Sequence, residues 1–300
     1  MPGAFALRAP EPGDADAVAA LLRARERRDL GTEETTADDV HEEWEHLRSG
    51  GTLDAWVVDG DDDGALAGYA VADGPDLVVA VHPGAVGRGL GGALRTAAEE
   101  RARARGTRVV RQFIPVTNTE ARIHLLDVGW WPVHHYFRMH IDLKDARPRP
   151  DVLARAFDPD RDAEEVWHLI EGAYAEVEGH LPQSLESWRA TALEQPGWDP
   201  AFWLLQHDAR GIVGVALGER GGKSESRTGI ITTVAVAERA RGRGHGRRLV
   251  ELLLSEFRGA RLRRAETAAH GPTAAAARVF EAAGMEVARE TQRWEKVLGV

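Results

Sequence analysis

A glycine-rich turn occurs twice in this chain, and the two copies stand one domain length apart. The first is Gly87-Arg-Gly-Leu-Gly-Gly92 and the second is Arg241-Gly-Arg-Gly-His-Gly246, so that Gly89 and Gly244 are 155 positions apart. Each copy follows an apolar run typical of a strand and precedes residues with helical spacing. The repeat of strand, glycine turn and helix predicts a duplication within the 300 residues.

The same order of elements can be followed through both halves. In the first half we expect helices at 14–28 and 36–48, strands at 56–58, 65–72 and 77–81, a helix at 93–105, a strand at 107–113, a helix at 118–127 and a closing strand at 134–143. In the second we expect helices at 162–175 and 187–193, a hairpin at 203–206 and 212–217, a strand at 229–236 and a helix at 247–257. The proline-containing stretch at 148–150 separates two predicted domains, residues 1–146 and 147–300.

Composition excludes several classes of protein. The chain has no cysteine, which excludes a disulfide framework, a thiolate metal site and a cysteine nucleophile. The net charge of −10 disfavours a nucleic-acid partner and suits a cationic, amine-bearing small molecule. We expect no membrane segment, because no apolar run approaches 18 residues, and a cytoplasmic location, because residues 1–8 lack the pattern of a signal peptide.

The repeated turn predicts a binding site for phosphate groups. The first N–H groups of a helix are unpaired and carry the positive end of the helix dipole, and glycine lets a ligand approach the main chain. Arginines crowd the second copy at positions 241, 243, 247 and 248. The first copy fits the dinucleotide pattern, but the second has Arg247 in place of the third glycine, and neither copy contains the Gly-Lys-Ser/Thr of a Walker loop.

In these motifs the chain resembles the GNAT superfamily of N-acetyltransferases, whose acyl-CoA motif is Arg/Gln-x-x-Gly-x-Gly/Ala after a strand ending in Val. The second copy, from Val236 to Gly246, matches every defined position, whereas the first copy has Val86 in place of Arg/Gln. The family's later helix ending in Gly-Phe has counterparts ending at Gly129-Trp130 and Gly284-Met285. In length and layout the chain is similar to the tandem mycothiol synthase type.

The resemblance implies an α/β (α+β) fold of two tandem acetyltransferase-type domains, each a mixed, mostly antiparallel twisted sheet flanked by helices. It also implies acetyl-CoA as co-substrate and no metal. The residues implied to bind the cofactor in the second domain are Thr233, Val234, Val236, Arg241, Gly242, Arg243, Gly244, His245, Gly246 and Arg247. The corresponding residues of the first domain are Val81, Gly87, Arg88, Gly89, Gly91 and Gly92.

The usual catalytic groups of the family are not found at their places. Ile230 stands where the family often has a Glu base, and Phe280 stands where it often has a Tyr acid; Leu125 takes the Tyr place in the first domain. Attack of an amine on a thioester needs a group that removes a proton. Substitutes are expected in the loop after the first helix of the second domain, which usually lines the acceptor pocket: Tyr174, Glu176, Glu178 and His180, with Glu266 and Thr267 as weaker candidates.

Two patterns that resemble metal sites are rejected. Residues 59–64 match the start of a calcium loop, but position twelve is Ala70 rather than Glu, and a hairpin turn explains the acidic run. His41 and His46 are five positions apart, whereas two zinc ligands on one helix face are four apart.

The sequence therefore predicts an enzyme that transfers an acetyl group from acetyl-CoA to a small, cationic amine by direct attack in a ternary complex. The second domain is expected to be catalytic and the first degenerate, in a monomer or homodimer. Two alternatives stay open at this point: a non-catalytic acyl-CoA binding or sensing protein, and a protein or peptide N-acetyltransferase.

Overall fold

The chain forms two compact units in the computed structural model, which describes residues 5–61, 64–147, 153–175, 177, 179–194, 198–221 and 227–299. The first unit is Met1–Val133 together with Thr291–Val300, and the second is His134–Glu290. The first unit therefore contains both ends of the chain. The domain boundary predicted between residues 146 and 147 divides the two sequence repeats, and it stays a prediction.

The elements of the first repeat run from the N-terminus to residue 142. They are η1 (Pro12–Asp14), α1 (Ala15–Leu30), α2 (Ala37–Ser49), β1 (Ala55–Asp59), β2 (Leu66–Asp73), β3 (Asp76–Val81), η2 (Pro83–Ala85), α3 (Leu90–Ala104), β4 (Val109–Pro115), α4 (Thr119–Asp127) and β5 (Trp131–Asp142). Helix α2 begins with a capping box in which Thr36 and Asp39 bond each other's backbone N–H, and α1 ends at Gly31 in the left-handed conformation.

The elements of the second repeat follow in the same order. They are β6 (Ala154–Ala156), α5 (Pro159–Tyr174), α6 (Leu185–Leu193), η3 (Pro200–Phe202), β7 (Trp203–Asp208), β8 (Gly211–Arg220), β9 (Thr228–Val236), η4 (Glu238–Ala240), α7 (His245–Gly259), β10 (Arg264–Gly271), η5 (Ala274–Ala277), α8 (Arg278–Ala282) and β11 (Glu286–Val297). Helix α5 begins at Pro159 after the cap Asp158, whose side chain accepts from two backbone N–H groups.

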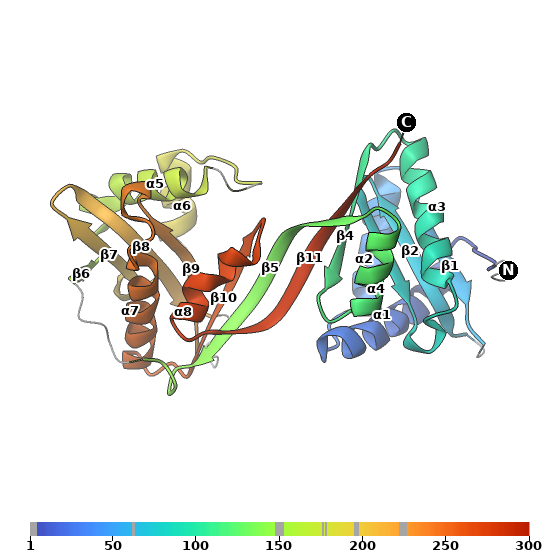
Figure 1. Ribbon diagram of the computed structural model, residues 1–300, viewed down its shortest axis with the longest axis horizontal. Coiled ribbons are helices and arrows are strands. Elements are labelled where there is room, and N and C mark those ends of the chain that lie inside the picture. Colours follow the sequence, from blue (N-terminus) through green and yellow to red (C-terminus); the bar gives the residue numbers. More distant parts are fainter. Residues whose placement is uncertain are drawn as a thin grey trace. The chain divides into compact units, whose positions relative to one another are not determined.

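The sheets of the two units share one pairing pattern. In the first unit β1–β2 and β2–β3 are antiparallel, β3–β4 is parallel and β4–β11 is antiparallel. In the second unit β6–β7, β7–β8 and β8–β9 are antiparallel, β9–β10 is parallel and β10–β5 is antiparallel. Mixed, mostly antiparallel sheets flanked by helices confirm the predicted fold class (Figure 1).

The last strand of each repeat belongs to the sheet of the other unit. Strand β5, predicted as the closing strand of the first half, pairs with β10 from His135–Gly271 to Asp142–Arg264. Strand β11 at the end of the chain pairs with β4 from Thr291–Pro115 to Val297–Val109. The apolar pattern along one strand indicates which of its faces is buried but not which strand it pairs with, so the sequence did not tell which sheet each of these strands completes.

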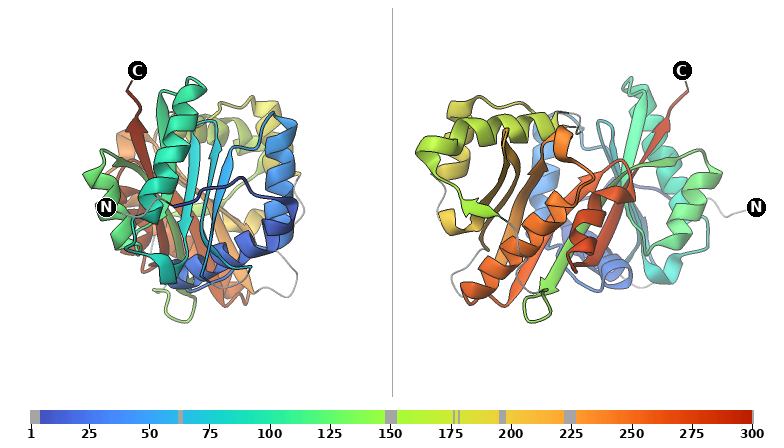
Figure 2. Two further views of the ribbon diagram at one scale, coloured as in Figure 1. Left: turned by 90° about the vertical axis from the view of Figure 1, so that its right-hand side faces the viewer. Right: turned by 60° about the vertical axis from the view of Figure 1, so that its left-hand side comes forward.

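Alternate residues of the central strands pack against different helices. In the second unit Leu205 and Val215 pack with α5 and α6, whereas Leu204 and Ala216 pack with α7 and α8. In the first unit Val57 packs with α1 and α2, and the neighbouring Val58 packs with α3. Because successive strand side chains point to opposite faces, helices cover both faces of each sheet (Figures 1 and 2).

Element bounds agree with the sequence prediction to within a few residues. The largest differences are three residues: α3, α5 and β5 begin three residues earlier than expected, and β8 ends three residues later. At α3 the glycine turn leads directly into the helix. The counterpart of the predicted later helix in the second repeat is divided into η5 and the short α8. None of the described helices has the length and apolar character needed to cross a membrane.

Trp294 tests the contribution of the exchanged strand β11 to the first unit. It is 1% exposed and lies in a core with Leu77, Val110 and Trp130. We expect Trp294→Ala to lower the free energy of unfolding of this unit by about 4 kcal/mol, through lost burial and the cavity left behind. Val297→Ala is the matched control, since Val297 is 75% exposed on the same strand and its change should stay within about 0.5 kcal/mol. Equal urea unfolding curves for the two variants would contradict the assignment of β11 to this core.

Candidate functional site

In both units the two parallel strands separate before they end. Strands β9 and β10 are paired from Thr228–Arg264 to Ile231–Thr267, while β9 continues beside β8 as far as Val236. Strands β3 and β4 are paired at Asp76 and Arg111. Backbone groups on the facing edges beyond these pairs need other partners. A cavity opens at each divergence.

The cavity of the second unit has a volume of about 440 Å³. Strand β9 supplies one wall and the end of β10 supplies the opposite wall, and the other lining residues come from α5 and the residues after it, the second glycine turn, α7, η5 and α8. The described lining residues are Ala173, Tyr174, Val177, Thr232, Thr233, Val234, Ala235, Val236, Arg241, Gly246, Thr267, Ala268, Ala269, His270, Ala276, Val279 and Phe280. The mouth of this cavity therefore adjoins the second glycine turn.

The cavity of the first unit is of similar size, about 470 Å³, and occupies the equivalent place. Its lining residues come from β3, β4, the first glycine turn, α1, α3 and α4. They are Arg25, Arg28, Val79, Val81, Ala85, Val86, Gly87, Gly89, Leu90, Gly91, Gly92, Arg95, Gln112, Ile114, Asn118, Glu120, Ala121, His124 and Leu125. Duplication of the sequence has therefore duplicated the cavity.

Both glycine turns have the same backbone conformation. Gly242 and Gly244 have φ of 74° and 79°, and the matching Gly87 and Gly89 have φ of 84° and 85°. Only glycine adopts this left-handed region without strain, which explains the spacing Gly-x-Gly. Gly244 and Gly89 are the N-cap residues of α7 and α3, and neither helix has a side-chain cap. The first N–H groups of both helices therefore have no capping side chain and can serve an anion.

The structure brings part of the predicted cofactor set of the second unit to the cavity wall. Thr233, Val234, Val236, Arg241 and Gly246 line the cavity. The turn residues Gly242, Arg243, Gly244, His245 and Arg247 lie beside it in the connection to α7 but do not line it. The His245 ring is directed to the sheet, since its Nδ1 lies 3.0 Å from Gln206 Oε1.

The predicted set of the first unit is divided in the same way. Val81, Gly87, Gly89, Gly91 and Gly92 line the cavity. Arg88 does not: it is exposed, and it bonds Asp61 at 3.2 Å.

A helix side chain approaches the same strand position in each unit. Arg25 of α1 donates a hydrogen bond of 3.2 Å from Nη1 to the carbonyl oxygen of Val79. Tyr174 of α5 forms a hydrogen bond with the backbone of Val234, which stands 155 positions after Val79. Burial raises the pKa of Tyr174, and this hydrogen bond partly offsets the rise. In the first unit the carbonyl of Val79, a residue that lines the cavity, therefore already accepts a hydrogen bond from Arg25.

The cavity of the first unit is lined by buried polar side chains. Gln112 is 3% exposed, and its Nε2 has no hydrogen-bond partner among the described residues. Arg95 is 7% exposed and lies 2.8 Å from Nε2 of His124 and 3.5 Å from Glu99. Burial lowers the pKa of His124, and the charge of Arg95 lowers it further. A neutral His124 can accept the bond from Arg95.

The predicted catalytic residues fall in several different places. Glu176 and Glu178 lie outside the described residues. His180 is partly buried; its Nε2 lies 2.9 Å from Glu171 Oε2, and its ring centroid is 6.0 Å from that of Tyr174. Thr267 lines the cavity but its hydroxyl donates to the carbonyl of Ile231, and Glu266 pairs with Arg264 at 2.9 Å.

Sequence reasoning missed a histidine pair in the second unit. His270 lines the cavity at the end of β10, and its Nδ1 lies 3.2 Å from Nε2 of His134 on β5. Tyr136 stacks on His270 with an interplanar angle of 23° and centroids 5.9 Å apart. The pair joins residues 136 positions apart, so no local spacing could have revealed it.

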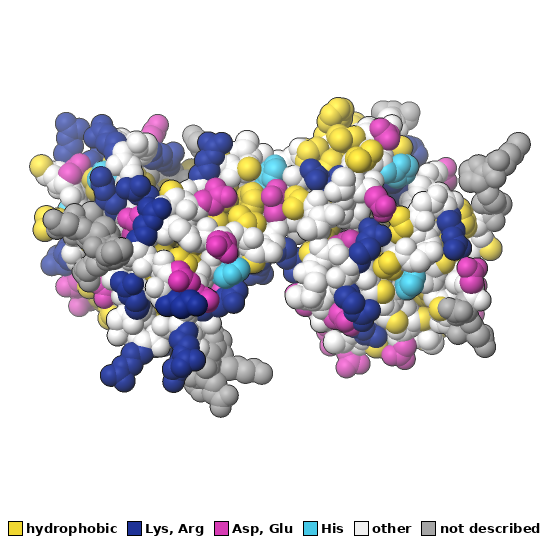
Figure 3. All heavy atoms as spheres, turned by 60° about the horizontal axis from the view of Figure 1, so that its bottom comes forward, with side chains coloured by type: hydrophobic (Ala, Val, Ile, Leu, Met, Phe, Trp, Pro, Cys, Tyr) yellow, Lys and Arg dark blue, Asp and Glu magenta, His cyan; other side chains and the backbone are white. Residues whose placement is uncertain are grey.

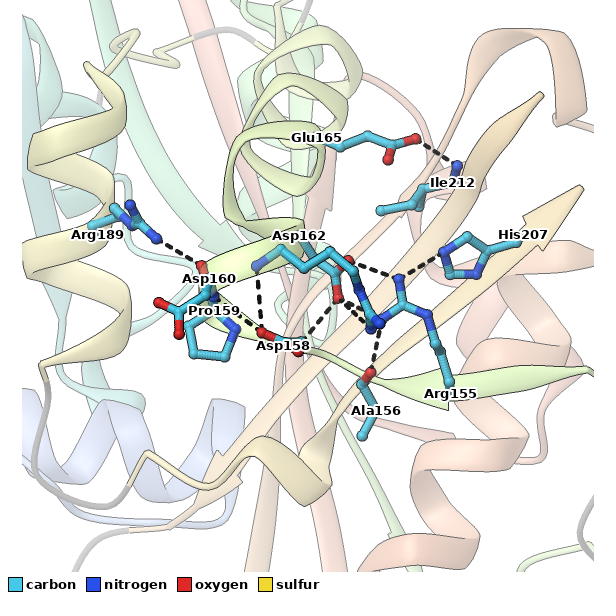
Figure 4. Close-up of polar contacts among 11 residues, drawn as sticks. Arg155, Ala156, Asp158, Pro159, Asp160, Asp162, Glu165, Arg189, His207 and Ile212 are labelled. Carbon is cyan, nitrogen blue, oxygen red and sulfur yellow. Dashed lines mark hydrogen bonds and ion pairs between the residues drawn. The ribbon is translucent and has the colours of Figure 1, made fainter.

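Helix α5, which carries Tyr174, is fixed at its start by a buried carboxylate. Asp162 is 2% exposed and accepts hydrogen bonds from Arg155 of β6, from Arg161 and from the N–H of Asp158 (Figure 4). Further along the helix, Glu165 accepts from the N–H of Ile212 at 2.6 Å. These contacts attach α5 to β6 and β8 and so fix the position of the cavity wall that α5 forms.

Basic side chains are locally concentrated despite the negative total charge. Figure 3 shows one face of the molecule, on which Lys and Arg side chains gather more densely over the second unit than over the first. At the second turn Arg241, Arg243 and Arg247 are exposed. The described residues hold no cluster of three or more His, Cys, Asp or Glu that could bind a metal ion.

The chain matches the model of the Acetyltransferase (GNAT) family twice, over residues 18–130 and 163–285. It is 30% identical over 291 residues to a mycothiol acetyltransferase of Thermobispora bispora, covering 91% of this chain and 92% of that protein. It is 35% identical over 226 residues to a mycothiol acetyltransferase of Kineococcus radiotolerans, covering 70% of this chain and 71% of that protein.

Two solved structures resemble the whole chain. A GCN5-related N-acetyltransferase from Sphaerobacter thermophilus has a TM-score of 0.66 at 28% identity, covering 99% of this chain and 97% of that one. A tandem GNAT protein from the clavulanic acid biosynthesis pathway has a TM-score of 0.53 at 18% identity, covering 99% of each chain, and this similarity concerns the fold.

Asp162 gives a pH-dependent test of how α5 is held. Burial alone would raise its pKa, but the hydrogen bonds from Arg155 and Arg161 hold the pKa well below its usual range. A depressed folded pKa gives stability that is present above the unfolded value, about 4, and is lost as the pH falls through the folded value. We expect Asp162→Asn to cost about 3 kcal/mol of unfolding free energy at pH 7, with the difference from wild type shrinking below about pH 4.

Asp160→Asn is the matched control for this prediction, because Asp160 is exposed on the same helical turn. Denaturant unfolding of the three proteins between pH 3 and 7 measures the effect. A constant difference across this range would contradict the role of the Asp162 carboxylate.

Proposed function

The chain belongs to the acetyltransferase (GNAT) family, and on this premise we propose that it transfers an acetyl group from acetyl-CoA to the amine of a small molecule. One observation carries the proposal: a cavity opens between diverging parallel strands and adjoins an uncapped helix start with two left-handed glycines. The strand edge can pair with the amides of an extended pantetheine arm, and the helix start can bind a pyrophosphate.

The acetyl-CoA is held in the second unit by the residues of β9 and the turn. Backbone groups of Thr233, Val234 and Val236 pair with the pantetheine, and the N–H groups from Arg241 to Arg247 bind the pyrophosphate. The exposed arginines add positive charge where the phosphates lie. The thioester then lies in the divergence, beside an amine that enters along α5, and the walls exclude water.

The acceptor is a small amine. The relatives carry the name mycothiol acetyltransferase, and an acceptor of the mycothiol type is the first to test. A cavity of about 440 Å³ suits a small molecule rather than a protein segment. Tyr174 lines this cavity. Tyr174, Glu176, Glu178 and His180 stay the groups predicted from the sequence to act on the amine.

The first unit has a second function, acyl-CoA binding without turnover, through the proposed set Val81, Gly87, Arg88, Gly89, Gly91 and Gly92. Arg25 weighs against turnover in this unit, because its hydrogen bond takes the carbonyl of Val79, which a pantetheine would use at the equivalent position. We therefore expect acyl-CoA to bind this unit more weakly than the second unit. Asp29, which is 5% exposed, pairs with Arg28 at 3.0 Å and accepts from Asn118 at 2.8 Å. These contacts join the end of α1 to the start of α4 and narrow the acceptor side of this cavity.

Calorimetric titration of acetyl-CoA tests the proposed binding site. We expect Arg241→Glu/Gly244→Glu to weaken binding at the second unit by roughly 100-fold, because the charge reversal and the new side chains act where the phosphates lie. Arg210→Glu, at an exposed turn 31 positions before Arg241, is the control for the arginine charge reversal. Unaltered binding in the double variant would show that the second turn does not hold the phosphates.

Release of free CoA thiol, measured with a panel of amino sugars, cysteinyl amides, polyamines and a mycothiol-type acceptor, tests which unit turns over. We expect Gly244→Glu to abolish turnover and Gly89→Glu to remove a binding event in the first unit. Loss of turnover in Gly89→Glu with full activity in Gly244→Glu would assign catalysis to the first unit. A wild-type protein that binds acetyl-CoA and releases no thiol with any acceptor would favour binding without catalysis.

A further inference from the structure

The cavity of the second unit has few groups that can exchange a proton. Among its described lining residues the titratable side chains are Tyr174, Arg241 and His270. An arginine stays protonated, and burial raises the pKa of Tyr174. Imidazole is the group whose ordinary pKa lies near neutrality. His270 is therefore the described cavity residue whose chemistry suits a proton acceptor.

His270 lies on the wall opposite the cofactor strand. It stands three residues after Thr267, the last residue of β10 that pairs with β9, so it faces the divergence where the thioester is proposed to lie. Its neighbour in register on β5 is Tyr136, whose ring stacks on the imidazole. The turn after it is closely packed, since a Cβ on Gly271 would lie 3.0 Å from Ala276. The ring is thus held against the strand.

His134 controls which nitrogen of His270 can act. It is 2% exposed, and its Nε2 lies 3.2 Å from Nδ1 of His270. Of the two nitrogens one must donate and the other accept. When Nδ1 of His270 carries the hydrogen and His134 accepts it, Nε2 of His270 keeps its lone pair. The bond also persists when His270 becomes an imidazolium, because Nδ1 still donates.

We propose that His270 is the catalytic base of the second unit and that His134 is a positioning residue that holds it in the Nδ1–H tautomer. The inference rests on the proposed acetyl transfer in this unit. It names a residue pair outside the loop of residues 174–180.

The proton balance of the step is simple. Nε2 of His270 takes one proton from the ammonium form of the acceptor, directly or through one water, and leaves a neutral amine. The amine nitrogen bonds to the thioester carbonyl carbon, the C–S bond breaks, and the second nitrogen proton passes to the CoA thiolate. His270 then loses its proton to solvent, to which its side chain is exposed. Amide, CoA thiol and one released proton are the products.

Other charged and titratable groups near His270 could contribute to a pH profile of the reaction. His134 and Tyr136 face it from β5, and Tyr174 and Arg241 line the same cavity from α5 and the turn. The lining residues from η5 and α8 are Ala276, Val279 and Phe280, which carry no charge. Because His134 is a second imidazole in contact with His270, the pH profiles of His270→Asn and His134→Leu must be compared.

Tautomer measurement by long-range ¹H–¹⁵N NMR tests the geometry without any acceptor. His270→Asn assigns the signals by their loss from the spectrum of the full chain. We expect His270 to carry its hydrogen on Nδ1 at high pH, and His134→Leu to change this tautomer because no acceptor remains. His134→Asn, which keeps an amide oxygen, should restore part of it. A dominant Nε2–H tautomer in the wild type would overturn the proposal.

Kinetics test the role of the base with the panel amine that the wild type acetylates fastest. We expect His270→Asn to lower kcat by about 100-fold or more while the Kd for acetyl-CoA changes by less than about twofold. The deficit should shrink as the assay pH approaches the pKa of the amine, since more amine then arrives neutral. His134→Leu should shift the acidic limb of the kcat profile to lower pH, because the imidazolium loses a hydrogen-bond acceptor.

His168→Asn is the matched control, since His168 is exposed on α5 and does not line the cavity. A kcat for His270→Asn within threefold of the control overturns the proposal, whereas a large deficit that is independent of pH indicates a structural role and also overturns it. Failure of the wild type to bind acetyl-CoA would instead overturn the function on which the proposal rests. The calorimetric and kinetic results therefore separate the two failures.

Discussion

The interruption of parallel pairing between two strands is the constraint on which the sites of this protein depend. Beyond Ile231 and Thr267 the edges of β9 and β10 turn apart, and buried backbone groups on those edges must find partners other than each other. Side chains and a ligand can supply them. The same interruption after Asp76 and Arg111 gives the first unit a cavity of nearly equal volume.

Different side chains contact the diverging strand in the two units, and their proposed roles differ accordingly. Arg25 donates to the Val79 carbonyl in the first unit, where Arg95 and Gln112 are also buried against the cavity. In the second unit the phenol of Tyr174 lies at the equivalent strand residue, and the opposite wall ends in His270. An arginine bonded to the strand competes with a pantetheine amide, whereas an imidazole across an open divergence can take a proton.

The last strand of each unit's sheet comes from the other sequence repeat. Trp294 and Lys296 of β11 reach the core of the first unit, where Lys296 lies 2.8 Å from Glu99, and Glu99 also accepts from Trp130. Strand β5 likewise brings His134 and Tyr136 beside His270 in the second unit. The exchange thus contributes to stability in one unit and to the candidate chemistry in the other.

The sequence alone determined the duplication, the element order and the glycine turns, because each depends on local properties. A left-handed backbone at Gly242 and Gly244 and an uncapped helix start are encoded within a few residues. The mixed sheet was predicted from the resemblance to the GNAT family, which the glycine motifs carry.

Only the tertiary structure decided which strand completes which sheet, because strand pairing joins residues far apart in the chain. For the same reason it alone brought His134 to His270, 136 positions apart, and Arg25 to Val79, 54 positions apart.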